Sequence, residues 1–190
     1  MVRFSAIKAM TDNQKLKHIH TAIQKKFKDK KLVFGYGPIG AKIVFVGETV
    51  DPDAFEKARP LNQSSEKLLN QLLRLAGIDK NKVYVTNVVK YLPTRDHAIS
   101  PKEIKSHATF LKEEVKTINP LIVVTLGNLA LNGIGMRQPL DNVHGRTFNL
   151  GSYELLPTYH PEHALRDPRI KELLANDFSK LKELLKIKGA

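Results

Sequence analysis

Glu48, Asn87 and His160 are the side chains whose types and positions in this chain best suit chemistry. Glu48 and His160 follow short apolar runs, and Asn87 lies near the end of another, all of the kind that forms strands buried on both faces of a sheet. In open, mainly parallel sheets, ligands bind beyond the carboxyl ends of the strands. We therefore expect a carboxylate, an amide and an imidazole to converge on one ligand, although they lie far apart in the sequence.

Each of these residues also has a plain structural interpretation. Glu48 alone would be a solvated loop residue, and Asn87 alone would satisfy a backbone group in a turn. Pro161 disfavours the helical region for His160, which places the histidine in a loop at a strand exit. The same pair also fits a strand-to-helix connection in which Pro161 starts a helical turn and His160 is partly buried. The shared position of Glu48, Asn87 and His160 at strand ends favours a functional role over these structural ones.

The rest of the chain supplies the elements that position these side chains. Apolar runs predict strands over residues 42–46, 82–89, 120–126 and 153–156. Apolar residues at helical spacing predict helices over residues 15–27, from Ser64 or Ser65 to 76, 100–118 and 170–185, with a short helix after Gly127. Residues 49–62 contain two prolines and no clear period, which predicts a long irregular loop.

Strands that alternate with helices predict an α/β fold. We expect a three-layer α/β/α sandwich around a mainly parallel central sheet of about four strands. No repeat, low-complexity tract or linker divides the chain. A single domain over residues 1–190 follows, with residues 1–30 as an N-terminal helical extension packed on it.

Composition narrows the class of partner. The chain has 190 residues, no cysteine, and 31 basic against 19 acidic residues, which gives a net charge of +12. The missing cysteines exclude disulfides, thiolate zinc sites and iron–sulfur clusters. The charge favours a polyanionic partner, although a solvated lysine-rich surface, common in proteins from hot environments, explains it nearly as well.

The motifs at the strand ends resemble those of the uracil-DNA glycosylases, most closely the family 4 enzymes. The histidine motif is similar over Thr158–Pro168 (TYHPEHALRDP), and the resemblance spans roughly residues 30 to 187. The strand that leads into the first motif matches at residues 41–48, the second strand at 82–90 and the third strand at 122–130. Two turns match at residues 35–43 and 144–146.

The resemblance implies a monofunctional enzyme that flips uracil or a related deaminated base out of DNA and hydrolyses its bond to deoxyribose. His160 would stabilise the charge on the departing base, and Asn87 would pair with the edge of the base. Glu48 would position water or favour the sugar cation. Gly47 would lie beside the base. The residues that would face DNA are Lys90, Arg95, Gly127, Asn128, Arg146, His163, Leu165 and Arg166.

The first motif departs from the family pattern. After Gly-Glu the family continues with Ala-Pro-Gly, whereas this chain has Thr49-Val50-Asp51. Asp51 becomes a candidate second carboxylate near the sugar. The aromatic residue that stacks on uracil is replaced by Leu61, so Phe55 is considered as an alternative stacking residue. These changes leave open a shift in base preference.

The same resemblance bears on cofactors and location. Tyr91 and His107 stand where two of the family's cluster cysteines would be expected, so we expect no iron–sulfur cluster and a region held by packing. His160 and His163 are three residues apart without an evident third ligand, which argues against a metal. With no membrane-spanning run and no signal peptide, we expect a cytoplasmic, nucleoid-associated monomer that binds damaged DNA and no membrane.

Two rival functions remain open at this point. The altered first motif favours a non-catalytic DNA-binding member of the superfamily, whereas Asn87 and His160 favour an enzyme because binding to phosphates needs neither. A nucleotide-binding α/β protein unrelated to repair would instead bind free nucleotides and show no salt-sensitive affinity for DNA.

Overall fold

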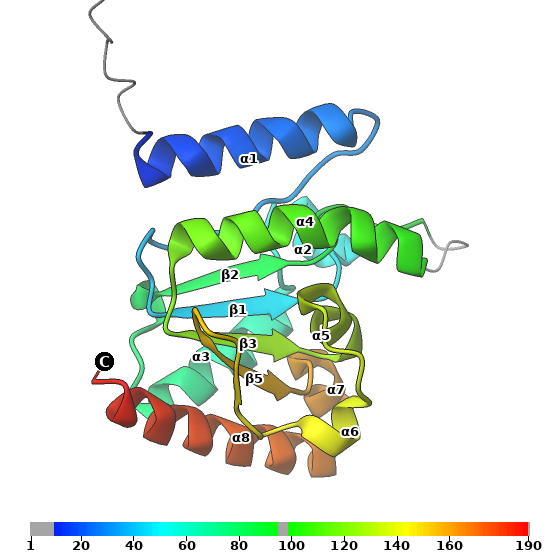
Figure 1. Cartoon of the computed structure of the whole chain (residues 1–190). Helices are drawn as coiled ribbons and strands as arrows, with labels where there is room; N and C mark the ends of the chain where they lie inside the picture. Colours follow the sequence, from blue (N-terminus) through cyan, green and yellow to red (C-terminus); the bar gives the residue numbers. More distant parts are fainter. Residues whose placement is uncertain (1–9, 95–98, 190) are drawn as a thin grey trace, which may run out of the picture.

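A computed structural model describes residues 10–94 and 99–189. At its centre is a five-stranded sheet of order β2-β1-β3-β5-β4, in which only β4 is antiparallel (Figure 1). The strands are β1 (Ile43–Gly47), β2 (Val83–Asn87), β3 (Ile122–Leu126), β4 (Phe148–Asn149) and β5 (Glu154–Thr158). The sequence predicted about four strands. The fifth is β4, whose two residues are too few to produce a recognisable pattern.

The parallel strands are covered on both faces. Side chains alternate along β1, so Val44 and Val46 enter one hydrophobic cluster while Ile43 and Phe45 enter the other. Every residue of β1, β2 and β3 is buried. Burial on both faces explains why these strands appear in the sequence as continuous apolar runs.

Helices form a layer on each face of the sheet, which confirms the α/β/α sandwich. The first hydrophobic cluster lies under α4, α5 and α6, and the second under α3, α7 and α8. The first layer comprises α4 (Pro101–Ile118), α5 (Asn128–Ile134) and α6 (Leu140–Val143). The second comprises α3 (Gln63–Ala76), α7 (Pro161–Arg166) and α8 (Pro168–Ile187). A 3-10 turn, η1 (Lys80–Lys82), precedes β2.

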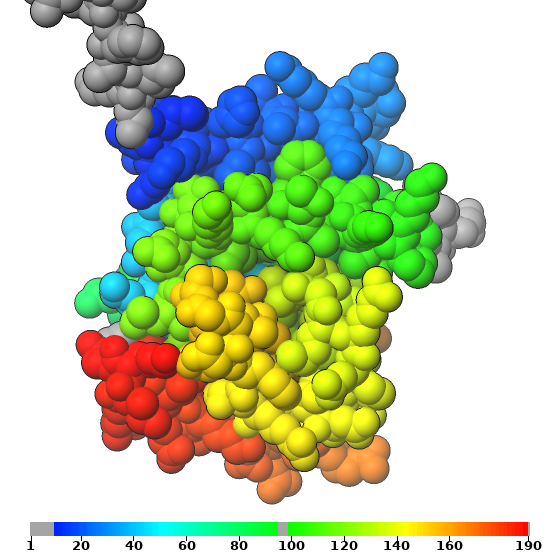
Figure 2. Space-filling view, viewed as in Figure 1, coloured from blue at the N-terminus to red at the C-terminus, as the bar shows by residue number. Residues whose placement is uncertain are grey.

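The N-terminal helix α1 (Asp12–Lys26) packs along the outside of α4 (Figure 2). Thr11 and Gln14 form a reciprocal capping box, which begins the helix three residues before the predicted start. Ile19 and Ile23 are its buried residues. No helix within residues 10–94 and 99–189 is both long and apolar enough to cross a membrane.

Two local predictions were wrong. The segment predicted as irregular loop contains a short helix, α2 (Pro52–Glu56), because Asp51 caps it and Pro52 occupies its first turn. Five residues are too few to show a helical period. The cap of α3 is Asn62, whose side chain accepts a hydrogen bond from the Ser65 amide, so neither Ser64 nor Ser65 starts the helix. The capping box at Ser100 and Glu103 is confirmed.

Candidate active site

The carboxyl ends of the parallel strands meet at one edge of the sheet, and a small cavity opens there. Its volume is about 60 Å³. The cavity is lined by Glu48, Thr49, Asp51, Pro60, Leu61, His160, Glu162 and His163. Larger hollows along α3 include no histidine among their lining residues.

His160 is the N-cap of α7, and Pro161 begins that helix, as expected for a strand-to-helix connection. The imidazole of His160 also lines the cavity. Its Nδ1 atom accepts a hydrogen bond from the Glu162 amide at 3.2 Å. Because an amide can only donate, the neutral ring carries its proton on Nε2. Burial, helped by His163 and opposed by Asp51, lowers the pKa of His160 to about 4. The ring is therefore a neutral hydrogen-bond donor at neutral pH.

Glu48 follows β1 and reaches the first turn of α5. Its Oε1 atom accepts a hydrogen bond from the Leu129 amide at 3.0 Å, and it thereby caps a helix whose own N-cap, Gly127, offers no side chain. Gly127 has φ of 98°, and a side chain there would collide with the Glu48 carboxylate. Burial raises the pKa of Glu48, although the Leu129 amide opposes the shift. The bond to the Leu129 amide thus fixes the Glu48 carboxylate in place at the cavity.

Asn87 ends β2 and lies behind the cavity wall. Its Nδ2 atom donates to the carbonyl oxygens of Thr49 at 3.0 Å and Pro60 at 2.7 Å. Its Oδ1 atom is buried and has no partner among the described residues. This oxygen faces Gly47, where any side chain would collide with it, and Leu61 lies against the same space. A buried acceptor without a partner costs about 1–3 kcal/mol, so the unpaired oxygen of Asn87 calls for a specific explanation.

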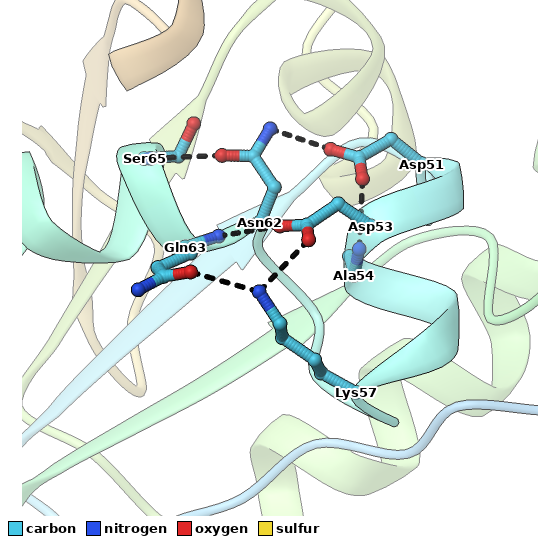
Figure 3. Close-up of polar contacts among 7 residues, drawn as sticks. All are labelled: Asp51, Asp53, Ala54, Lys57, Asn62, Gln63 and Ser65. Atoms are coloured by element: carbon cyan, nitrogen blue, oxygen red, sulfur yellow. Dashed lines mark hydrogen bonds and ion pairs between the residues drawn. The ribbon is translucent and has the colours of Figure 1, made fainter.

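Asp51 lines the cavity, but both of its carboxylate oxygens are used (Figure 3). One accepts from the Ala54 amide at 2.9 Å and so caps α2. The other accepts from the Asn62 side chain at 2.6 Å, and Asn62 in turn caps α3 through Ser65. Asp51 therefore ties together α2 and α3, the two helices that follow the altered first motif.

The two candidates for contact with the face of a base have separate places. Leu61 is buried at the cavity wall beside Gly47. Phe55 does not line the cavity: it packs on Val50 and Ala54, and the Lys31 ammonium lies 4.8 Å from its ring centre. Phe55 is thus unsuited to the stacking role considered for it, and Leu61 is the apolar side chain available there.

Helix α7 presents the exposed residues that were predicted to face DNA. Leu165 is 49% exposed and is one of five exposed large apolar side chains among the described residues. Arg166 is exposed and reaches Glu162 at 2.6 Å, and His163 is exposed beside the cavity. Asn128 and Arg146 are also exposed. Arg95 lies outside the described residues.

Two residues predicted to contact DNA lie in the interior. Lys90 is 1% exposed, and its ammonium contacts the Glu114 carboxylate at 2.7 Å, so it cannot reach a phosphate. The signal that was missed is Glu114, an acidic residue on the apolar stripe of α4 with Leu111, Val115 and Ile118. Gly127 is buried as well, and its amide donates to Thr158, so its place is beside Glu48.

Aromatic packing fills the region predicted to lack a cluster. The His107 ring stacks on Phe27 with centres 4.1 Å apart, and Tyr91 lies 5.3 Å from His107. The Tyr91 hydroxyl donates to Glu103 at 2.9 Å. With no cysteine in the chain, these residues do not fit an iron–sulfur cluster. The described residues also contain no group of three metal-ligating side chains.

A lysine-rich run at residues 25–31, here called the lysine run, begins in the last turn of α1 and continues beyond it. The Lys30 ammonium lies 5.1 Å from the Tyr91 ring centre, and Lys31 covers Phe55. The run therefore lies beside the exit of β2, at the same edge of the sheet as the cavity. Its lysines make no ion pair with any residue that the structure describes. This positive surface was not predicted from the sequence.

Comparisons with known proteins agree with this geometry. The family model described as "Uracil DNA glycosylase superfamily" matches residues 34–185. The chain is 32% identical to a type-4 uracil-DNA glycosylase of Thermotoga maritima over 83% of this chain and 85% of that protein. It is 32% identical to one of Saccharolobus solfataricus over 84% of this chain and 78% of that protein. A DNA polymerase of Bacillus phage SP01 is 28% identical over 80% of this chain and 16% of the polymerase.

Proposed function

Because the chain belongs to the uracil DNA glycosylase superfamily, we propose that it hydrolyses the bond between a deaminated base, uracil above all, and deoxyribose in DNA. One observation carries the proposal. The Glu48 carboxylate and the neutral His160 imidazole line the same cavity, and the unpartnered oxygen of Asn87 lies directly behind it.

His160 would stabilise the departing base. As the glycosidic bond breaks, its electron pair moves onto the base and spreads to the base's carbonyl oxygen. The Nε2–H group of a neutral imidazole can donate to that oxygen in both the substrate and the anion. An imidazolium would add a positive charge that burial disfavours, as the lowered pKa of His160 indicates. The Nε2–H group of His160 would thus be a pre-positioned hydrogen-bond donor of the kind that stabilises oxyanions in other enzymes.

Asn87 would read the hydrogen on a ring nitrogen of the base. Its NH₂ group is already committed to Thr49 and Pro60, which leaves only the Oδ1 acceptor free. Deamination converts the acceptor nitrogen N3 of cytosine into N3–H in uracil, and N1 of adenine into N1–H in hypoxanthine. An unpaired buried acceptor therefore favours these products and repels their parent bases.

Glu48 would act on the sugar side of the reaction. Its partly buried carboxylate can favour the oxocarbenium character of the sugar and accept the proton of the attacking water. The water oxygen then bonds to the anomeric carbon, and the base leaves as an anion that later takes up a proton. No lysine is required as a nucleophile, which corresponds to a monofunctional enzyme.

DNA would approach along the edge of the sheet that carries the cavity. Leu165 offers an exposed apolar wedge for the gap left by a flipped nucleotide, and Arg166, His163, Asn128 and Arg146 are exposed for phosphates. The lysine run extends the positive surface beside β2. We further propose that the protein acts as a monomer and without an iron–sulfur cluster.

The experiment is base release from labelled oligonucleotides that carry uracil, hypoxanthine or xanthine, with cytosine and thymine as reference bases. His160→Ala and Asn87→Ala should each lower release by about 10²–10³-fold. His18→Ala and Asn132→Ala, which change exposed residues of the same types, serve as matched controls. Abasic product that depends on His160 and Asn87 supports glycosylase chemistry at this cavity.

A non-catalytic DNA-binding protein is the second candidate. The small cavity and the double use of the Asp51 carboxylate favour it, because both leave less room and less free charge near a sugar. Salt-sensitive DNA binding without release of any of the three deaminated bases would replace the enzyme with this alternative. Affinity for free nucleotides without affinity for DNA would exclude both.

A further inference from the structure

A buried ion pair lies directly beneath the residue proposed to read the base. The Lys90 ammonium contacts the Glu114 carboxylate at 2.7 Å, and the side chains are 1% and 0% exposed. Tyr84 donates its hydroxyl to the same carboxylate at 2.9 Å. Burying two charges costs several kcal/mol for each ion, and apolar residues often replace such a pair without loss of stability. The pair therefore calls for an explanation other than stability.

The remaining bonds of Lys90 lead to the end of β2. Its ammonium donates to the Thr86 hydroxyl at 2.6 Å and to the backbone carbonyl of Asn87 at 3.0 Å. Together with Glu114, these partners use all three donors of the ammonium. Lys90 thus closes the turn over residues 87–90 and anchors it to α4.

The same turn is bonded to the strand that carries Glu48. The amide of Val88 donates to the Gly47 carbonyl, and the amide of Val89 donates to the Glu48 carbonyl, each at 3.0 Å. The Asn87 side chain is held by Thr49 and Pro60 from the other side. A displacement of this turn would therefore move the Asn87 oxygen and the backbone of Glu48 together.

We propose that Lys90 and Glu114 are positioning residues. This buried pair holds the Oδ1 atom of Asn87 in the position and orientation needed to accept a hydrogen bond from the base. This inference rests on the proposed function. Neither residue touches the substrate. Their action passes through the carbonyl of Asn87, which the Lys90 ammonium holds in one orientation.

The decisive variant removes both charges and keeps the side-chain volumes. Lys90→Met or Glu114→Gln alone leaves one charge buried without its partner, and each should lower the melting temperature strongly. The double variant Lys90→Met/Glu114→Gln leaves no unpaired charge, and Tyr84 keeps an acceptor. We expect it to melt close to the wild type, to bind DNA equally well, and to release uracil about 100-fold more slowly, as a misplacement of about 1 Å can produce.

The matched control is Lys112→Met/Glu113→Gln, the same two types of change on the exposed side of α4, the helix that carries Glu114. This control should leave the rate of uracil release unchanged. If the double variant at residues 90 and 114 regains both the melting temperature and the rate of uracil release, the pair is merely structural and the inference is overturned.

A second readout does not depend on turnover. The side-chain NH₂ signals of Asn87, assigned with Asn87→Ala, should exchange slowly with D₂O in the wild type because both hydrogens are bonded and buried. In the double variant, exchange should be at least about tenfold faster, the size of a 1.4 kcal/mol loosening. Unchanged exchange would overturn the inference. A wild type that releases no base would refute the proposed function, while this exchange measurement would still decide the role of the pair.

Discussion

The Glu48 carboxylate accepts a hydrogen bond from the backbone amide of Leu129, with a nitrogen–oxygen distance of 3.0 Å, across 81 residues of sequence. This bond joins the end of β1 to the first turn of α5. It gives Glu48 two separable properties, a hydrogen-bond acceptor that caps a helix and a negative charge at the cavity. Substitutions can remove one property without the other.

Glu48→Gln keeps an acceptor for the Leu129 amide and loses the charge. We expect a melting temperature close to that of the wild type and base release lowered by at least about 100-fold. Glu48→Ala should in addition lose about 1 kcal/mol of stability, because α5 loses its cap. Thermal melts and single-turnover release measure the two effects. Full activity in Glu48→Gln would show that the charge is not used.

The acid side of the pH–rate profile should report Glu48 and not His160. Burial raises the pKa of Glu48 above its ordinary value of 4.5, whereas the pKa of His160 is lowered to about 4. As the pH falls, Glu48 therefore takes up a proton first, and release should decline with it. In Glu48→Gln this step should disappear, leaving a decline only near pH 4. A step near pH 6.5 that survives in Glu48→Gln would mean that His160 titrates normally.

Asp51 should prove to be a residue of the cavity wall. Its two oxygens hold Ala54 and Asn62, and Asp51→Asn preserves an acceptor for the α2 cap. We expect Asp51→Asn to reduce base release only a few-fold, and Asp51→Ala to lower the unfolding free energy by about 1 kcal/mol through loss of the cap. Urea unfolding and single-turnover release provide the comparison. A 100-fold loss of release in a stably folded Asp51→Asn protein would instead make the Asp51 charge part of the chemistry.

The lysine run should contribute to the salt dependence of DNA binding. Lys30→Gln/Lys31→Gln removes two charges beside the exit of β2, and the slope of log K against log salt should shrink by about one per lysine. Lys80→Gln/Lys82→Gln removes two charges before the start of β2, at the opposite end of the strand, and should leave the slope nearly unchanged. Fluorescence anisotropy at several salt concentrations measures both slopes. Equal slopes in the two variants would remove the lysine run from the DNA contact surface.

His107 should make the fold sensitive to mild acid. Burial, with Lys90 and Lys26 nearby, lowers the pKa of His107 from 6.5 to about 4. Between these values the unfolded chain binds the proton and the folded chain does not, so stability is full above pH 6.5 and falls as the pH drops towards 4. A shift of this size corresponds to about 3 kcal/mol.

His107→Phe keeps the stack on Phe27 and removes the titrating group. We expect the difference in urea midpoint between pH 7.5 and pH 4.5 to shrink in this variant, while His18→Gln, at an exposed position, keeps the wild-type difference. An unchanged difference in His107→Phe would assign the acid sensitivity to other groups, such as the partly buried His20, whose pKa is also lowered by burial.

The sheet and the strand ends could be predicted because their information is local. Continuous apolar runs located the four parallel strands, and the first two positions beyond the ends of β1 and β5 located Glu48 and His160. The partners of these residues could not be predicted, because each comes from a distant segment. Leu129 offers a backbone amide, which leaves no trace in the side-chain pattern. Lys90 looked like a surface charge, because only the fold brings Glu114 of α4 against it.

The close contact between Gly127 and Glu48 also limits which substitutions this sequence can tolerate. Position 127 tolerates no side chain while the Glu48 carboxylate occupies the adjacent space, and its φ of 98° favours glycine in any case. A substitution at residue 127 would therefore have the same effect as a substitution of Glu48, because the new side chain would displace the Glu48 carboxylate from its position. Genetic screens for loss of function should recover changes at Gly127 together with changes at Glu48, with the same biochemical defect and an intact residue 48.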